Sequence, residues 1–308
     1  MRKAAFVNIV KHGTEARIKI AFIILTYRNS DDCVTCLDAI TKCMSAYDVR
    51  CYIVDSFYNE ISSNTIESVA KDNKVSYTRI NNNGYGYGNN IGIEIARSDF
   101  HPDYFIVCNP DTIIKSFPSS LMNDIAHVLG DPSSNAFIIA PDICNLNGKH
   151  QNPMIANSDE LFLSGIYKGY KSNSRLLRMF WYGINRCRRE LMLLKSRRKP
   201  LTQIYAPHGS FILFSSKAID DLNPVFDPNI FLFAEELLLA HDAMSSGINI
   251  YYTPLISILH KEDGSVGFLS KANELAIESN IYVFEKTHNV SCVNKNDYNK
   301  AGEDAYSN

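Results

Sequence analysis

Short apolar runs alternate with amphipathic segments through the first third of the chain. Their length and β-branched content predict buried strands at 18–25, 49–54, 75–80 and 104–108. Between the strands, apolar residues recur with helical spacing at 31–44, 64–71 and 91–96. Such alternation predicts parallel βαβ units, so we expect an α/β fold with a Rossmann-like, mostly parallel central sheet flanked by helices. A Gly/Asn-rich loop is expected over 81–90.

The second half of the chain is less regular. Strands are predicted at 136–140, 211–214 and 248–252, and helices at 117–129 and 235–246. Residues 174–199 form a basic amphipathic segment. Because neither a repeat nor a long linker interrupts the pattern, we expect one domain over 18–285, preceded by a lead at 1–17 and followed by a polar tail at 286–308.

Composition narrows the classes of function. A net charge of -2 over 308 residues gives no overall basic field, so nucleic acid is not an expected partner. No apolar run reaches the roughly 18 residues of a membrane span, and the apolar run at the N-terminus is too short for a signal peptide. We therefore expect a cytoplasmic protein. Cys33 and Cys36 have redox or zinc spacing, but no second pair lies at zinc spacing, so reduced core cysteines are the favoured interpretation.

Polar residues follow the ends of the predicted parallel strands. Thr26, Asp55, the Asn-rich loop and Asp111 all occupy such positions. Ligands of open α/β sheets bind beyond the carboxyl ends of the strands. The pattern therefore predicts a binding cleft of nucleotide size at this edge.

Five motifs then follow one another in a recognisable order. They are Ile-Leu-Thr-Tyr-Arg-Asn at 24–29, Ile-Val-Asp-Ser at 53–56, Asn-Asn-Gly-Tyr-Gly-Tyr-Gly-Asn-Asn at 82–90, Asn-Pro-Asp at 109–111, and Phe-Ala-Glu-Glu at 233–236 with His260 downstream. Each motif alone is weak, but the ordered set resembles glycosyltransferase family 2, in particular its bacterial rhamnosyltransferase-like members. The resemblance runs from about residue 20 to about residue 265.

The resemblance implies a GT-A fold with two functional halves. Residues 18–115 would bind the nucleotide-sugar, and 116–285 would carry the acceptor and catalytic functions, including the helical basic insertion at 174–199. It further implies inverting transfer from a UDP- or dTDP-sugar to a saccharide acceptor. In the resembled group that acceptor is commonly lipid-linked and serves bacterial surface polysaccharide synthesis, such as O-antigen or capsule.

The resemblance also implies a divalent cation, Mg or Mn, on the donor diphosphate. Asp111 lies in the DxD-type motif, where a hard carboxylate suits such an ion, and His260 aligns with a family metal ligand. Asn109 stands where many relatives have the first Asp, so Asp111 is the favoured ligand. The alternative is that residues 109–112 form a simple turn.

A general base is implied at the predicted helix start. Glu235 and Glu236 align with the family's Glu-Asp pair, and the second position supplies the base, so Glu236 is the candidate. Glu236 is one methylene longer than the usual Asp, and Leu238 replaces a further acidic residue found in many relatives. The alternative is a solvated helix N-terminus, where acidic residues are favoured in any case.

The remaining candidates concern the nucleotide-sugar and the acceptor. The motifs and strand ends point to ligand contacts by Thr26, Tyr27, Asn29, Asp55, Asn83, Gly84, Asn89, Asn90, Asn109 and Asp111. The glycine pattern is not a dinucleotide-binding fingerprint, because no acidic ribose partner follows at the right distance. The segment His208-Gly209-Ser210 matches the family's acceptor side.

Alternative interpretations remain for the role of residues 174–199 and for the class of activity. Cationic and apolar residues interleave over 174–199, which suits an anionic membrane surface on the inner face of the cell membrane, or equally a helical pair packed on the core. A nucleotidyltransferase would share an α/β nucleotide-binding half, although residues 26–29 lack its Gly-rich, basic phosphate loop. A non-catalytic nucleotide-sugar-binding protein is the third possibility, given the departures at Asn109, Glu236 and Leu238.

Overall fold

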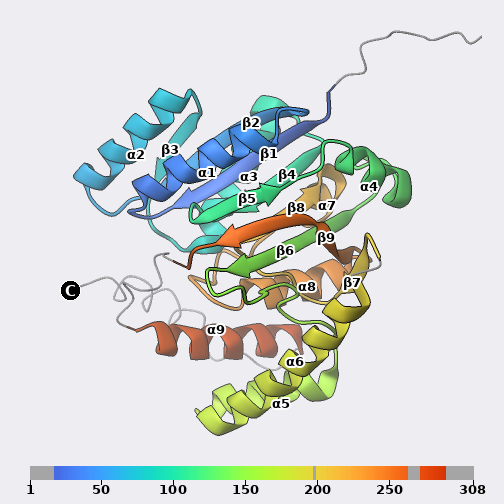
Figure 1. The fold of residues 1–308 in the computed structure, drawn as a ribbon. Helices are drawn as coiled ribbons and strands as arrows, with labels where there is room; N and C mark the ends of the chain where they lie inside the picture. Colours follow the sequence, from blue (N-terminus) through green and yellow to red (C-terminus); the bar gives the residue numbers. More distant parts are fainter. Residues whose placement is uncertain (1–16, 197–198, 263–270, 289–308) are drawn as a thin grey trace, which may run out of the picture.

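A computed structural model describes residues 17–196, 199–262 and 271–288 of the chain. This part contains one nine-stranded sheet with helices on both faces, so the predicted α/β architecture is confirmed (Figure 1). The strand order is β3-β2-β1-β4-β8-β6-β9-β5, with β7 paired to β9. Residues 1–16 of the predicted lead, 197–198 of the basic segment and 289–308 of the predicted tail lie outside the described residues.

The described strands and helices alternate through the first half of the chain. The strands are β1 (Lys19–Thr26), β2 (Asp48–Ser56), β3 (Ser76–Ile80), β4 (Tyr104–Cys108), β5 (Thr112–Ser116), β6 (Phe137–Asn145), β7 (Thr202–Ile204), β8 (Phe211–Ser215) and β9 (Asn249–His260). The helices are α1 (Ser30–Cys43), α2 (Glu60–Asn73), α3 (Tyr85–Phe100), α4 (Leu121–Leu129), α5 (Glu160–Lys171), α6 (Arg175–Ser196), α7 (Ser216–Asp221), α8 (Glu235–Ser245) and α9 (Ala272–Thr287).

Strand β1 lies inside the sheet and is covered on both faces. Side chains alternate along a strand, so Phe22 and Ile24 enter the core beneath α1, whereas Ala21 and Ile23 enter the core beneath α3. The strand pairs in parallel with β2 on one side and β4 on the other. Burial on both faces explains the unbroken apolar run in the sequence. The same register brings the ends of β1 and β2, Thr26 and Asp55, side by side.

The Gly/Asn-rich stretch is helical from Tyr85, which corrects the prediction of a loop over 81–90. Its glycines allow α3 to approach the sheet closely. A Cβ on Gly88 would lie 2.3 Å from Leu25 Cδ1, and one on Gly92 would lie 2.5 Å from Ile23 Cγ2. Packing therefore outweighs the poor helix propensity of glycine at these positions.

The second half of the sheet is mixed. Among the described strands, β6 and β9 pair in parallel, whereas β8 is antiparallel to β4 and β6, and β5 and β7 are antiparallel to β9. The sequence did not predict β5, β7, α5 or α9. The two strands are only five and three residues long. Helix α9 buries the polar residues Ser279, Asn280 and Glu285 beside its apolar ones. Its sequence therefore lacks a clear amphipathic spacing.

Helices α5 and α6 pack against each other beside α9 (Figure 1). The contact is close, since a Cβ on Gly165 would lie 2.0 Å from the Trp181 indole. The α5–α6 segment leaves and rejoins the body at one place, because Ile155 and Ala206 form an isolated antiparallel bridge. Among the described helices, none combines the length and apolarity that crossing a bilayer requires.

Gly84 is the glycine whose replacement should cost the most stability. It has a φ of +99°, and a Cβ there would lie 2.3 Å from the Phe231 carbonyl oxygen. Gly84→Ala must therefore move backbone, and we expect the free energy of unfolding to fall by about 3 kcal/mol in urea titrations. Gly183→Ala is the control, because that position in α6 has open space and should gain about 0.5–1 kcal/mol. Equal effects of the two changes would contradict the prediction.

Candidate active site

A pocket of about 820 Å³ opens where β1 and β4 end. This is the edge at which an open α/β sheet binds its ligand. The sequence-predicted residues that line it are Thr26, Tyr27, Asn29, Gly84, Asn109, Asp111, His208, Gly209, Ser210, Glu235, Glu236 and His260. Residues far apart in the sequence, including Asp111 and Glu236, are thus brought to one cavity.

Asp111 is held between β4 and β5 by backbone contacts. The Asn109 amide donates to the Ser210 carbonyl at 2.9 Å, and the Lys261 amide donates to the Asp111 carbonyl at 3.0 Å. The side chain of Asp111 is 1% exposed, yet neither carboxylate oxygen accepts a hydrogen bond from the described residues. A buried, unsatisfied carboxylate is costly unless a positive charge compensates it.

His260 faces Asp111 because Thr112 and His260 are partners in the β5–β9 ladder. Gln151 fixes the ring. Its Nε2 donates to Glu262 Oε1 at 2.7 Å, so its Oε1 is left to accept from His260 Nδ1 at 2.8 Å. A neutral His260 then carries its proton on Nδ1, and its unprotonated Nε2 lies 3.3 Å from Asp111 Oδ2.

These two acceptor atoms repel each other unless a cation or a proton lies between them. An imidazole whose far nitrogen is held by a hydrogen bond is the usual arrangement of a metal-binding histidine. The oxygen and nitrogen donors of Asp111 and His260 therefore fit a divalent cation.

Glu235 and Glu236 open α8 after two residues in the left-handed region, Phe233 (φ 74°) and Ala234 (φ 65°). Glu236 Oε1 accepts a hydrogen bond from the Gly209 amide at 3.0 Å. Burial raises the pKa of Glu236 above its ordinary value, with the Gly209 bond opposing the shift. Burial, reinforced by the charge of Glu236, raises the pKa of Glu235 well above its ordinary value. Burial therefore favours the neutral form more strongly at Glu235 than at Glu236.

His208 lies against His260, with ring centroids 5.5 Å apart. Its Nδ1 accepts a hydrogen bond from the Ser210 amide at 3.2 Å, and the Ser210 hydroxyl lies 2.9 Å from the same nitrogen. Burial, assisted by His260, lowers the pKa of His208 to about 3. His208 is therefore neutral at physiological pH and presents Nε2–H as a hydrogen-bond donor.

Two predicted ligand contacts at the sheet edge lie outside the residues that line the pocket. Asp55 is buried at the end of β2, where the Tyr77 hydroxyl donates to its Oδ2 at 2.8 Å. Asn83 is exposed just before α3. Asp55 is thus bound by Tyr77, and Asn83 does not line the pocket. A role for either residue in binding the nucleotide stays a prediction.

Asn89 and Asn90 also lie outside the pocket lining, because they belong to α3 rather than to a loop. Asn89 is fully buried, and its Nδ2 donates to the Tyr85 carbonyl at 3.0 Å. Both amide atoms of Asn90 bind the backbone of Phe226, at 2.7 and 3.1 Å. Asn90 therefore fastens α3 to the segment before α8.

Several pocket residues were not predicted from the sequence. Tyr170 from α5 and Tyr182 from α6 line the cavity, and their hydroxyl groups are 2.9 Å apart. Asn280 of α9 and Gln151 also line it. Tyrosine and amide side chains occur throughout the sequence without a motif around them, so only their position around the pocket identifies these residues.

The contact between Gly209 and Glu236 yields a testable prediction. A Cβ on Gly209 would lie 2.6 Å from Glu236 Oε1, so Gly209→Ala must displace that carboxylate. We expect transfer activity to fall about a hundredfold with little change in unfolding temperature, because the clash involves a movable side chain. Initial-rate kinetics and thermal denaturation measure the two effects. Wild-type turnover in this variant would show that Glu236 need not occupy this position.

Part of the chain matches a known protein family. Residues 21–220 match the family described as Glycosyl transferase family 2. Among solved structures, the fold is similar to that of GalNAc-T7 with UDP, GalNAc and Mn2+, with a TM-score of 0.58 and 11% sequence identity. The match covers 94% of this chain and 54% of the other, so the chain spans about half the length of that protein. At this identity the likeness shows the shared GT-A fold alone.

No curated protein sequence matches the chain. The family match nevertheless covers well over half of it and includes the residues after β1 and β4 as well as His208. The chain therefore belongs to glycosyl transferase family 2.

Proposed function

We propose that the protein transfers a glycosyl group, with inversion, from a UDP- or dTDP-sugar to a hydroxyl of a saccharide acceptor. The observation that carries the proposal is the meeting of Asp111 and Glu236 in one pocket. The Asp111 carboxylate lies beside His260 and is suited to a cation. The Glu236 carboxyl is ionisable and accepts a hydrogen bond from the Gly209 amide.

The donor would lie against the ends of β1 and β4. Thr26, Tyr27 and Asn29 line this side of the pocket and are suited to the nucleoside. Asp111 and His260 would hold Mg or Mn beside the diphosphate. The bound cation would supply positive charge to the leaving diphosphate.

The acceptor would enter from the side of α5, α6 and α9. Glu236 would accept the proton of the attacking hydroxyl as its oxygen bonds to the anomeric carbon. The bond to the diphosphate breaks on the opposite side, so one displacement inverts the configuration. Glu235, whose neutral form burial favours, would hydrogen-bond an acceptor or donor oxygen. Tyr170 and Tyr182, which line the pocket, would contact the acceptor sugar.

A direct test is to incubate the protein with a panel of UDP-, dTDP- and GDP-sugars in the presence of Mn or Mg. We expect donor-dependent stabilisation in thermal-shift assays and slow release of the nucleoside diphosphate. Proton NMR of a glycoside product would show the inverted anomeric configuration. Formation of a nucleoside triphosphate and a sugar 1-phosphate on addition of pyrophosphate would instead indicate a nucleotidyltransferase. Tight donor binding without turnover on any acceptor would indicate a non-catalytic binding protein.

The α5–α6 surface supports a lipid-linked acceptor, as in O-antigen or capsule assembly by rhamnosyltransferase-like enzymes. Exposed apolar side chains cover it, namely Leu161, Leu176, Met179, Phe180, Leu191 and Leu194. Helix α6 also carries Arg175, Arg178, Arg186, Arg188, Arg189 and Lys195, and its one acidic residue is Glu190. Interleaved basic and apolar residues suit the surface of an anionic membrane, so we propose that this surface docks there.

Vesicle sedimentation measures this docking. We expect binding to vesicles that contain phosphatidylglycerol, weaker binding to pure phosphatidylcholine, and release as salt rises. The double change Phe180→Ser with Leu191→Ser should reduce binding about tenfold or more. Val128→Ser is the matched control, because Val128 is similarly exposed but lies on α4. Equal binding by all three proteins would contradict the docking proposal without affecting the transferase assignment.

A further inference from the structure

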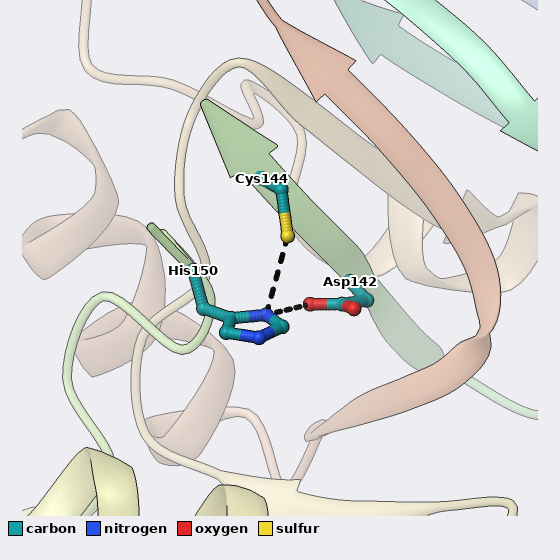
Figure 2. A group of neighbouring side chains, drawn as sticks. All are labelled: Asp142, Cys144 and His150. Atoms are coloured by element: carbon teal, nitrogen blue, oxygen red, sulfur yellow. Dashed lines mark hydrogen bonds and ion pairs between the residues drawn. The ribbon is translucent and has the colours of Figure 1, made fainter. Parts of the chain in front are cut away.

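A second group of potential metal ligands lies on the hairpin after β6. Asp142 and Cys144 are two residues apart on this strand, so both side chains emerge on one face, while Ile143 between them is buried. The chain then turns and returns antiparallel, and His150 forms a backbone bridge with Cys144. Figure 2 shows the three side chains meeting beside the strand.

The three side chains converge on one nitrogen. His150 Nδ1 lies 2.6 Å from Asp142 Oδ1 and 3.4 Å from Cys144 Sγ (Figure 2). A catalytic Cys-His-Asp relay would use a different ring nitrogen for each neighbour, so this group is not such a relay. One Nδ1 proton serves only one of the two contacts. All three ligand atoms lie within 4.8 Å of one another, which is a distance that one bound ion can span.

The donor types select the metal. Thiolate, imidazole and carboxylate together are ligands of zinc, whereas Mg and Mn favour oxygen. Zinc bonds of about 2.0–2.3 Å in a tetrahedron place donor atoms roughly 3.5 Å apart. The nitrogen–sulfur distance already has this value, and the nitrogen–oxygen pair needs to open by about 1 Å. The His150 side chain is 39% exposed, which leaves room for entry and for a water as fourth ligand.

The surroundings of the group also suit a metal. Burial, assisted by the charge of Asp142, raises the pKa of the Cys144 thiol, so the metal-free site holds a neutral thiol. A dication reverses this preference and binds the thiolate. Tyr252 is buried near Asp142, and burial together with the charge of Asp142 raises the pKa of Tyr252. A phenol in this position can hydrogen-bond a ligating carboxylate and orient it.

We propose that Asp142, Cys144 and His150 bind a zinc ion that fastens the hairpin to β6. The hairpin matters to the active site because the next residue, Gln151, orients His260. The Gln151 amide donates to the Ile143 carbonyl at 2.8 Å, so its backbone is part of the same hairpin. The zinc site is separate from the cation site at Asp111, and it is built of softer donors.

The test measures zinc rather than activity. Metal-free protein would be incubated with zinc, desalted and analysed for bound metal, and cobalt would be added in parallel as a spectroscopic probe. We expect one zinc per chain and a thiolate-to-cobalt charge-transfer band for the wild type. Cys144→Ser and His150→Ala should lose the zinc, and the charge-transfer band should be absent in Cys144→Ser. Zinc should also raise the unfolding temperature of the wild type but not of these variants.

Two controls make the outcome specific. Cys187→Ser removes an exposed cysteine on α6 and should keep the zinc. Asp111→Asn disables the proposed catalytic cation site and should also keep it. The proposal is overturned if the wild type retains no zinc, or if zinc is lost in Asp111→Asn while Cys144→Ser retains it. Circular dichroism of each variant separates loss of metal from loss of fold.

Discussion

Replacing Glu236 with Gln is expected to lower kcat about a thousandfold while leaving KM for the donor almost unchanged. The amide cannot accept the proton of the acceptor hydroxyl. It keeps the size of the side chain, and its oxygen can still accept the hydrogen bond from the Gly209 amide. Initial rates at saturating donor and acceptor give kcat. Retention of wild-type kcat would remove Glu236 from the reaction.

Glu235→Gln is the matched control for this change. Burial, reinforced by the charge of Glu236, raises the pKa of Glu235 well above its ordinary value, which favours its neutral carboxyl form. Gln has the shape and hydrogen-bonding groups of that neutral acid. We therefore expect kcat to change by less than about fivefold. A larger loss in Glu235→Gln than in Glu236→Gln would reverse the assignment of the two roles.

The pH dependence of turnover follows from the same pair. The proposed base Glu236 can accept a proton only when ionised, and burial raises its pKa above the ordinary value. Activity should therefore fall as pH is lowered through this raised pKa, at a higher pH than an exposed Glu would give. The acidic limb should be absent from the residual activity of Glu236→Gln. An acidic limb of unchanged position in both proteins would point to another group.

Asp111→Asn is expected to lower kcat/KM about a thousandfold, which corresponds to roughly 4 kcal/mol of transition-state stabilisation. The variant should also fail to bind Mn in a titration followed by electron paramagnetic resonance. Asn109→Ala is the control, because Asn109 lines the same pocket but contributes no charge. It should keep Mn binding. Equal loss of Mn in both variants would mean that the cation depends on the loop rather than on the Asp111 carboxylate.

The same substitution should stabilise the metal-free protein. The Asp111 carboxylate is buried without a hydrogen bond from the described residues, so its charge opposes folding when no cation is bound. Removing that charge should raise the free energy of unfolding by about 1–3 kcal/mol. Addition of Mn should reverse the order, because only the wild type gains from binding. Denaturation with and without Mn measures both effects.

The sequence predicted the parallel half of the fold well, because strands buried on both faces appear as unbroken apolar runs. Strand β4, for example, has the predicted bounds. It also predicted that Asp111 and Glu236 share a cavity, through motifs at strand and helix ends. It misplaced the start of α3, because glycines in close contact with β1 resemble loop residues.

Other features depend on contacts that a single sequence does not reveal. Gln151 orients His260 only because β9 returns beside β6, and no local pattern indicates that pairing. Asn90 was predicted to bind the donor, yet its amide is occupied by the backbone of Phe226. The α5–α6 contact similarly depends on Gly165 meeting Trp181.

The bridge between Ile155 and Ala206 has a consequence for the proposed acceptor side of the pocket. The bridge joins the two ends of the α5–α6 segment, so the chain enters and leaves the segment side by side. Asp111 and His260 are positioned by β4, β5 and β9 instead. Under the proposed function, exchange of this segment would change the acceptor side of the pocket while the strands that place Asp111 and His260 keep their positions.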